Sequence, residues 1–398
     1  MIQIKHAIVG GTLALVLLVG WKTAHYFLDS TPPIVSIAGV DAQGFYCGDA
    51  QCSISTNKTG YLSVWLDGQP LLTQFKVKSG RENPFAIPTR TLVNGQHTLK
   101  IECVDTTYHK NKITADRAFI VDNAPLQAAF VKADADYKIF QGRTLHLQFQ
   151  VNKPIKEAKV QALSREFQAF PESPNSMIYE CFIPIDCEEV PNEYLLSVRM
   201  ADYVGNMLNL DNKFQVVLYP FKKQNLHVGK EKLDEEHSLG LAAAQDREQR
   251  FAKLAQQSPH EKMWHGNFCL PLPESARTTC DFGTIRTTQE KGRYMHKAVD
   301  LAAFPKSVIW APQAGKVVLK NRFEDTGNTV VIDHGWGVLS LFYHLDDFAA
   351  IEEGQKIAQG NPVGTLGKTG YATGYHLHWE MRVNNVAIDP MQWTKPTF

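Results

Sequence analysis

The chain has 398 residues, of which 44% are hydrophobic and 10% aromatic, so it is long enough for about two to four folded domains and too apolar to be disordered. Lysine and arginine together number 41, and aspartate and glutamate also number 41. This balance leaves no basic excess to attract nucleic acid, and we expect no nucleic-acid partner.

Residues 1–30 predict a membrane anchor or a signal sequence. The stretch from 7 to 21 carries no charged residue. As a helix it would span roughly 22 Å, which is short of the hydrocarbon core of a bilayer and also suits a signal peptide. A retained single-pass anchor is favoured, because Lys22 can extend its amine to the interface and no clear small-residue cleavage site follows. Aromatic residues typical of a membrane interface stand beside it, namely Trp21, Tyr26 and Phe27.

Seven cysteines form three closely spaced pairs and one single residue, Cys103. No pair has the spacing of a structural zinc site. We therefore expect three local disulfides formed in an oxidising compartment, which agrees with export of the chain across a membrane; free thiols are the alternative. The expected pairs are Cys47 with Cys52, Cys181 with Cys187, and Cys269 with Cys280.

Residues 31–123 and 124–219 each predict an immunoglobulin-like β-sandwich module. In both segments, short alternating or β-branched runs are separated by turn signals such as Asp67-Gly68. The second segment looks like a copy of the first, because His97–Asp105 aligns with Tyr194–Asp202. The two resemble the tandem modules of bacterial envelope proteins, and we expect a spacer role rather than the binding of sugar or peptide.

Residues 220–262 predict a helical connector. Helix-forming residues dominate from 234 to 257, with one apolar stripe amid charge, and Ser258-Pro259 ends the pattern. We expect this helix to pack on a domain. An alternative is that the helix, or a histidine beside it, acts as an inhibitory strap over the residues described next. The histidines in question are His237, His260 and His265.

Residues 263–398 predict an antiparallel β domain, because strand signals return and glycines for tight turns recur throughout. His376 and His378 are two apart, so on a strand they face the same side about 6.6 Å apart. One of these imidazoles can bind a metal while the other reaches a metal-bound water. His334, which follows a strong strand signal, is expected to be structural.

A metal site requires a bend between His296 and Asp300, which would lie about 13 Å apart on a straight strand. Together with one of the paired histidines they supply two neutral nitrogens and one carboxylate. This set matches an open catalytic zinc site with three protein ligands and a water. His344 and the remaining histidine can then hydrogen-bond the water and the developing oxyanion. Glu380, two residues beyond the pair, is expected to orient an imidazole.

The segment from 264 to 380 resembles the catalytic domain of the lysostaphin-like (LytM-type) zinc metallopeptidases. The resemblance rests on His296-x-x-x-Asp300, on Tyr343-His344-Leu345, and on Gly370-x-x-Thr-Gly-x-His-Leu-His-x-Glu380. It covers about a third of the chain. Ala298 stands where the family usually has glycine, which implies a slightly altered loop without the loss of a ligand.

By this resemblance, one zinc per chain is held by His296, Asp300 and His378, while His344 and His376 are catalytic. The family hydrolyses peptide bonds in the stems or cross-bridges of peptidoglycan. All five functional positions are present, which disfavours an inactive scaffold.

The sequence therefore predicts a membrane-anchored zinc endopeptidase that acts on peptidoglycan. The expected location is the bacterial cytoplasmic membrane, crossed once, with most of the chain in the periplasm or extracytoplasmic space. The two modules and the helix would form a stalk. The alternative is a non-enzymatic envelope protein that binds wall peptide and recruits or activates another hydrolase; stoichiometric zinc would favour the enzyme.

Overall fold

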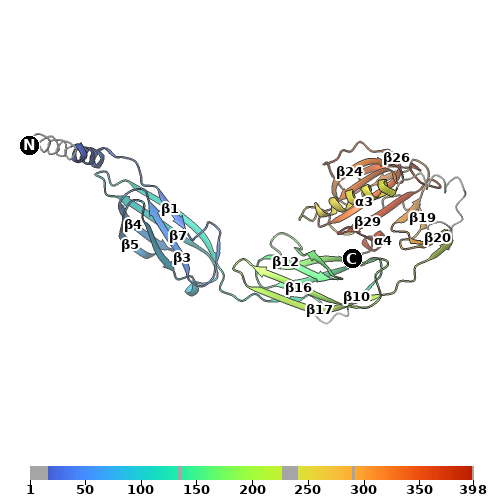
Figure 1. Ribbon diagram of the computed structural model, residues 1–398, viewed down its shortest axis with the longest axis horizontal. Helices are drawn as coiled ribbons and strands as arrows, with labels where there is room; N and C mark the ends of the chain where they lie inside the picture. The colour runs from blue at the N-terminus through green and yellow to red at the C-terminus, as the bar shows by residue number, and fades with distance from the viewer. Residues whose placement is uncertain (1–16, 133–136, 226–240, 289–291, 397–398) are drawn as a thin grey trace, which may run out of the picture. The chain divides into compact units, whose positions relative to one another are not determined.

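The computed structural model describes residues 17–132, 137–225, 241–288 and 292–396 (Figure 1). Strands dominate, which confirms the prediction of a mainly β protein. The chain divides into two compact units. The first holds residues 1–125 with 203–206, and the second holds residues 126–202 with 207–398.

The first unit is a sandwich of two β-sheets. Its elements are β1 (Val35–Ala38), β2 (Phe45–Tyr46), β3 (Ala50–Thr56), β4 (Gly60–Leu66), β5 (Gln69–Val77), β6 (Glu82–Ile87), the 3₁₀ helix η1 (Thr89–Thr91), β7 (Gly95–Asp105) and β8 (Lys112–Val121). One sheet has the order β1-β3-β6 and the other the order β2-β8-β7-β4-β5. Alternate residues of both sheets point inward and share one apolar core, which includes Ile54, Leu62 and Ile101.

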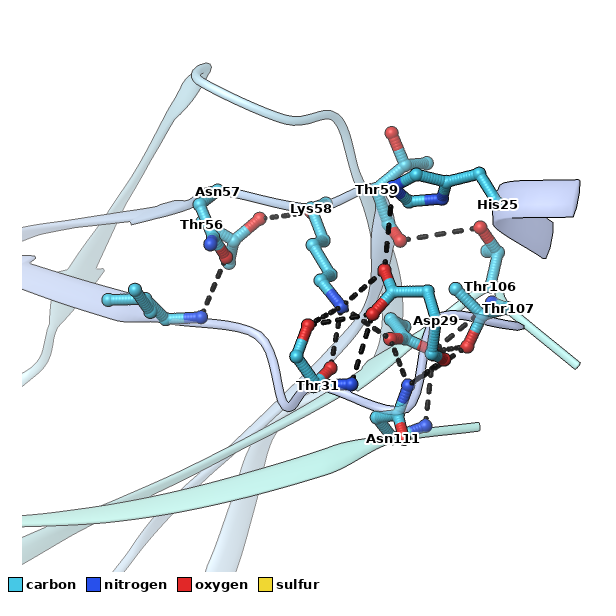
Figure 2. A network of polar contacts seen from close by, with 12 residues as sticks. His25, Asp29, Thr31, Thr56, Asn57, Lys58, Thr59, Thr106, Thr107 and Asn111 are labelled. Carbon is cyan, nitrogen blue, oxygen red and sulfur yellow. Dashed lines mark hydrogen bonds and ion pairs between the residues drawn. The ribbon is translucent and has the colours of Figure 1, made fainter. Parts of the chain in front are cut away.

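A helix over residues 17–28 precedes this sandwich, and the segment that leaves it is bonded to the sandwich (Figure 2). The ammonium group of Lys58 lies 2.7 Å from a carboxylate oxygen of Asp29 and 3.4 Å from one of Asp105. It also donates to the carbonyl oxygen of Thr31 at 2.5 Å. Hydrogen bonds from Lys58 and Thr31 hold the pKa of Asp29 well below its usual range. The network therefore fixes residues 29–31 to the loop after β3.

The predicted anchor over residues 7–21 falls mostly on residues 1–16, which lie outside the described part of the chain. Among the helices that are described, none is both long and apolar enough to cross a membrane.

The second unit begins with another two-sheet sandwich. Its strands are β9 (Ala128–Phe130), β10 (Tyr137–Phe140), β11 (Thr144–Val151), β12 (Ile155–Ala162), β13 (Arg165–Gln168), β14 (Phe170–Pro171), β15 (Ile178–Pro184), β16 (Glu193–Asp202) and β17 (Met207–Val217). The sheets have the orders β10-β17-β16-β12-β13 and β14-β15-β11-β9. They enclose a second core, which includes Phe149, Val160 and Val198.

The rest of the second unit is built on a large antiparallel sheet. Its elements are β18 (Lys223–Asn225), α3 (Leu241–Gln256), β19 (Arg277–Cys280), β20 (Ile285–Thr288), β21 (Gly292–Met295), β22 (Val299–Ala302), β23 (Val308–Trp310), β24 (Gly315–Phe323), β25 (Gly327–Asp333), β26 (Val338–Phe348), β27 (Lys356–Ile357), β28 (Pro362–Leu366), β29 (Leu377–Val383), β30 (Val386–Ile388) and α4 (Pro390–Trp393). The main path of the sheet is β19-β22-β29-β26-β25-β24-β27. A small separate sheet has the order β18-β20-β21.

The large sheet is covered on both faces. On one face, residues such as Phe342 and Trp379 belong to the main core of this domain. On the other face, Leu341 and Tyr343 pack with Phe251 of α3, and Figure 1 shows α3 lying over the sheet. This packing explains why β26 is buried along most of its length instead of alternating between buried and exposed positions.

The second sandwich and the large-sheet domain also share contacts. Phe182 of β15 is buried in the core of the large-sheet domain. The side chain of Gln392 in α4 bonds the backbone of Thr144 in both directions, at 2.7 and 2.9 Å. Arg143 forms an ion pair of 2.5 Å with Asp389, the residue that caps α4. These two domains therefore form one compact unit.

The predicted disulfides are wrong, because all seven cysteines are free thiols. Cys47 is exposed, whereas Cys52 is directed by the alternation of β3 into the core of the first sandwich. Cys181 lies in the core of the second sandwich, but Cys187 belongs to the core of the large-sheet domain. In both pairs the two cysteines are close along the chain, but their side chains lie in different environments and do not meet.

Candidate metal centre

Three adjacent strands place the candidate site on one face of the large sheet. β29 pairs with β22 on one side and β26 on the other. His378 of β29 is directly opposite Asp300 of β22 and directly opposite Tyr343 of β26. Directly opposed residues of antiparallel strands have their side chains on the same face. The register alone therefore brings a carboxylate and an imidazole together.

His296 joins this pair through the bend that the sequence required. β21 ends at Met295 and β22 begins at Val299, so residues 296–298 turn the chain between two strands. The turn is held by hydrogen bonds between the backbones of His296 and Thr284 (3.0 Å) and of Gly283 and His296 (2.7 Å). Ala298, at the position of the family glycine, is fully buried in this turn.

The donor atoms of the three predicted metal ligands converge on one carboxylate oxygen. Nε2 of His296 and Nδ1 of His378 each lie 3.0 Å from Oδ1 of Asp300. Donors that share one tetrahedral zinc stand about 3.3 Å apart, given metal–ligand bonds near 2.0–2.2 Å. Nε2 of His296 is buried and makes no hydrogen bond of normal geometry. A buried nitrogen of this kind beside a carboxylate fits a metal ligand, so these residues suit a zinc ion.

The electrostatics of the site keep these groups in the forms that bind a cation. Burial lowers the pKa of His296 to about 4, so its imidazole is neutral at physiological pH. Burial opposes ionisation of Asp300, but the adjacent imidazoles of His296 and His378 hold its pKa well below its usual range. Oδ2 of the same carboxylate accepts a hydrogen bond of 3.1 Å from Arg286. This guanidinium leaves Oδ1 to face the two imidazoles.

Two further histidines stand beside the three ligand candidates. Nδ1 of His344 lies 2.8 Å from the carbonyl oxygen of Thr369, and Nδ1 of His376 lies 2.9 Å from that of Gly374. A carbonyl can only accept, so each Nδ1 is a donor, and Nε2 is the ring nitrogen left to face the site. The two rings are 4.9 Å apart, and Nε2 of His376 lies 3.8 Å from Oδ1 of Asp300. All five predicted functional side chains therefore meet at one place.

His344 is held in an unusual backbone conformation. Its φ is +62°, in the left-handed region that residues with a side chain rarely adopt. Its amide donates to the carbonyl oxygen of Thr326 at 2.9 Å, which fixes the backbone there. Burial, together with the neighbouring His378 and His376, lowers the pKa of its imidazole to about 3. His344 is thus a neutral, oriented imidazole.

Glu380 was predicted to orient an imidazole, but its carboxylate makes its hydrogen bonds elsewhere. Its two carboxylate oxygens accept from the hydroxyl of Tyr343 at 2.8 Å and from Nε of Arg382 at 2.5 Å. The contact with a histidine is made by Tyr343 instead, whose ring stacks on that of His378 at 5.0 Å and 12°. Burial and the Glu380 carboxylate raise the pKa of Tyr343 well above its usual value, so its hydroxyl remains a donor.

Cys280 and Tyr343 are neighbours of the site that the sequence did not predict. Cys280, assigned above to a disulfide with Cys269, is directly opposite Asp300 across β19 and β22. Its sulfur lies within 4.8 Å of donor atoms of His296 and Asp300. Its place follows from strand register, and no spacing motif in the sequence marks it.

The histidines around the connector helix were considered above as a cover for the metal centre. His260 and His265 line a cavity of about 630 Å³ between the second sandwich and the large-sheet domain. His237 lies outside the described residues. α3 itself packs on the large sheet, as expected of a connector.

His334, which directly follows β25, is a structural residue. It is fully buried, with Nδ1 at 2.8 Å from the carbonyl oxygen of Ala314 and Nε2 at 2.9 Å from the hydroxyl of Ser340. The neutral ring donates from Nδ1 and accepts at Nε2, so both of its nitrogens are satisfied. Burial lowers the pKa of His334 to about 4.

We expect His334 to make the domain acid-sensitive. Between pH 6.5 and about 4 the unfolded chain binds a proton that the folded ring refuses, so the free energy of unfolding falls as the pH falls through this range. The loss amounts to roughly 3 kcal/mol at the lower end. Denaturant unfolding at several pH values measures it. His334→Asn should flatten this slope relative to wild type, whereas the same change at exposed His109 should not; equal slopes in all three would contradict the assignment.

Two imidazoles and a carboxylate around one point, flanked by two further imidazoles, are the donor set of a site for one hydrolytic metal ion. Residues 294–390 match the model of Peptidase family M23, so the C-terminal part of the chain is a peptidase domain of this family. The match confirms the resemblance to the lysostaphin-like peptidases.

Curated relatives match the same part of the chain. The chain is 35% identical over 103 residues to DD-carboxypeptidase/endopeptidase Mpg of Neisseria meningitidis serogroup B, which is 26% of this chain and 24% of that protein. It is 35% identical over 95 residues to peptidoglycan DD-endopeptidase ShyC of Vibrio cholerae, which is 24% of this chain and 22% of that protein. The chain thus spans about a quarter of the length of the curated relatives it matches.

A solved structure is also similar to the chain. It is a putative peptidase M23 from Pseudomonas aeruginosa, with a TM-score of 0.43 and 20% sequence identity. The similarity covers 66% of this chain and 96% of that one.

Proposed function

We propose that this protein is a zinc endopeptidase that hydrolyses peptide bonds in peptidoglycan. The observation that carries the proposal is the convergence of His296, Asp300 and His378 on one point, with two oriented imidazoles beside them. Wall peptide is the favoured substrate because relatives of this domain are named peptidoglycan DD-endopeptidases.

In this proposal one zinc per chain is held by Nε2 of His296, Oδ1 of Asp300 and Nδ1 of His378. When bound, zinc supplies Lewis acidity that polarises a carbonyl and lowers the pKa of a water. The lone pairs at Nε2 of His344 and His376 are available for the proton of the attacking water. The histidine that accepts this proton can pass it to the amine that leaves as the C–N bond breaks.

Membrane attachment is part of the proposal. The uncharged stretch from 7 to 21 supports a single-pass anchor in the bacterial cytoplasmic membrane, with the rest of the chain in the periplasm. The Lys58 network ties residues 29–31 to the first sandwich, so an anchor would continue without a free linker into a folded module (Figure 2). The two sandwiches would then act as a stalk. Fractionation of cells expressing the chain with and without residues 1–30 tests this: recovery of both in the soluble fraction would contradict it.

Digestion of purified peptidoglycan tests the catalytic assignment. We expect wild-type protein to release soluble muropeptides, which mass spectrometry identifies together with the bond that is cut. His344→Ala and His376→Ala should each lower the rate by at least about 100-fold, the usual scale of acid–base catalysis. Both should still hold zinc, because neither is a proposed ligand. His109→Ala, an exposed residue of the first sandwich, is the matched control and should keep full activity.

Two results would count against the proposal in different ways. Equal release by wild type and both variants would mean that another site is responsible. A protein that carries no zinc, releases nothing and still binds peptidoglycan would favour the non-enzymatic envelope protein instead.

A further inference from the structure

α3 lies outside the residues that match the peptidase family, yet it packs on the sheet face that carries His378. Three directly opposed pairs of β26 and β29 share this face, namely Tyr343 with His378, Leu341 with Glu380, and Leu339 with Arg382. The β26 members of these pairs form one buried cluster with Phe251 of α3. The helix therefore covers a surface that is continuous with the proposed metal centre.

A column of three parallel rings connects α3 to the metal centre. Phe251, which is fully buried, lies 6.3 Å from the ring of Tyr343 with an interplanar angle of 11°. The ring of Tyr343 in turn lies 5.0 Å from the imidazole of His378 with an angle of 12°. The imidazole of His378 is thus nearly parallel to the ring of Tyr343, and the ring of Tyr343 is nearly parallel to that of Phe251.

A chain of charged hydrogen bonds joins the same two places. Glu248 of α3 accepts from Arg382 at 2.8 Å. Nε of Arg382 donates to Glu380 at 2.5 Å, and Glu380 accepts from the hydroxyl of Tyr343 at 2.8 Å. Glu380, Arg382 and Tyr343 are all buried, so the two contacts of Glu380 are shielded from water, whereas the side chain of Glu248 is 46% exposed.

Both connections end on Tyr343. The ring column fixes the plane of the tyrosine, and the hydrogen-bond chain fixes the position of its hydroxyl, so the side chain has little freedom to tilt. A metal ligand must be held within about 10–20° of its productive orientation. His378 meets Tyr343 face to face, and any tilt of the tyrosine would be passed to the direction of Nδ1.

We propose that α3 is a positioning element of the metal centre, in which Phe251 and Glu248 hold Tyr343 against His378 and thereby set the affinity for zinc. The proposal rests on the assignment of His378 as a ligand. In this proposal, α3 of the preceding connector completes the domain that contains the residues matched by the family model.

The test is the dissociation constant of zinc, measured on the full chain by competition with a chromophoric chelator. Glu248→Gln removes the charge that anchors Arg382, and Phe251→Leu removes the first ring of the column. Each should weaken zinc binding by about 10-fold or more, the lower end of what loss of an outer partner of a ligand produces. Tyr343→Phe keeps the ring but loses the hydroxyl. Its dissociation constant for zinc should lie between that of wild type and those of these two variants.

Matched controls lie on the same helix and in the same cluster. Asp246 pairs with Arg250 on the exposed side of α3, so Asp246→Asn repeats the charge change without touching the chain to Tyr343. Phe323 packs edge-on against Phe251, so Phe323→Leu repeats the ring loss outside the column. Both controls should bind zinc within about twofold of wild type, which separates positioning from the general cost of a surface charge or a core cavity.

Replacing zinc with cobalt provides a second measurement, which a loss of packing alone would leave unchanged. The visible spectrum of bound cobalt reports ligand geometry, and we expect it to change in Glu248→Gln and Phe251→Leu but not in the controls. Wild-type zinc affinity and an unchanged cobalt spectrum in Glu248→Gln would overturn the proposal, even if Phe251→Leu failed to fold. Absence of zinc from wild type would instead refute the proposed function.

Discussion

Asp300→Asn is expected to leave the purified protein without stoichiometric zinc and without measurable release of muropeptides. Oδ1 of Asp300 is the atom that both ligand imidazoles face, at 3.0 Å each. The amide has the same shape as the carboxylate but no charge, so the two imidazoles would be left with no anion to offset a divalent cation. We expect the zinc affinity to fall by more than the roughly 100-fold that changes to outer partners of a ligand produce. Metal analysis after equilibrium dialysis and digestion of peptidoglycan measure the two effects.

Two neighbouring substitutions serve as controls for Asp300→Asn. Arg286→Lys keeps a positive charge beside Oδ2 but loses the planar fork, so we expect a smaller loss of zinc affinity, about 10-fold. Cys280→Ala removes the thiol beside Asp300 and should retain one zinc, because the proposed ligand set does not include it. If Cys280→Ala lost zinc while Asp300→Asn kept it, the ligands would have been assigned to the wrong side chains.

The site could be predicted from the sequence to the extent that local geometry defines it. The spacing of His376 and His378 predicts that both face one side of a strand; in the structure His376 directly precedes β29, and nitrogens of the two rings lie 3.8 and 3.0 Å from Oδ1 of Asp300. The four-residue separation of His296 and Asp300 demands a bend, and residues 296–298 supply it. Because these relations hold within a few residues of chain, they depend little on the rest of the fold.

The surroundings of the site depended on packing between distant segments and were not predicted. Glu380 was expected to orient an imidazole, but its carboxylate bonds Tyr343 of the neighbouring strand, and it is the tyrosine ring that contacts His378. That arrangement is set by the register of β26 against β29, which a single sequence does not show. The same is true of α3, whose apolar stripe predicted packing on a domain but not the residue that Phe251 would meet.

The cysteine pairs also show that spacing along the chain does not predict contacts that depend on tertiary packing. Five residues separate Cys181 from Cys187, and such spacing favours a local disulfide only if both side chains share one environment. β15 is buried on both faces, with Cys181 directed into the core of the second sandwich. Cys187 lies in the core of the large-sheet domain, so the pair is divided by the wall of the sandwich. The near-continuous burial of β15 is what a sandwich packed against a further domain requires.

Phe182→Ala is expected to destabilise the large-sheet domain although the residue belongs to a strand of the second sandwich. Its ring lies 5.2 Å from that of Trp393, 5.8 Å from that of Trp264 and 6.1 Å from that of Trp336. Truncation would leave a cavity among these rings at a cost of about 3–5 kcal/mol. Tryptophan fluorescence reports this domain, because residues 263–398 hold most of the seven tryptophans and residues 124–219 hold none.

The comparison of Phe182→Ala with two other truncations decides whether the second sandwich is part of the catalytic domain's core or only a spacer. Phe149→Ala removes a ring from the sandwich's own core and should mainly unfold that module. Phe140 is 47% exposed, so Phe140→Ala should change the free energy of unfolding by no more than about 0.5 kcal/mol. A fluorescence midpoint for Phe182→Ala that matched Phe140→Ala would mean that the two domains fold independently. A midpoint lowered well beyond it would mean that the sandwich cannot be removed without loss of the metal centre, because the strands that hold Asp300 and His378 belong to the core that Phe182 completes.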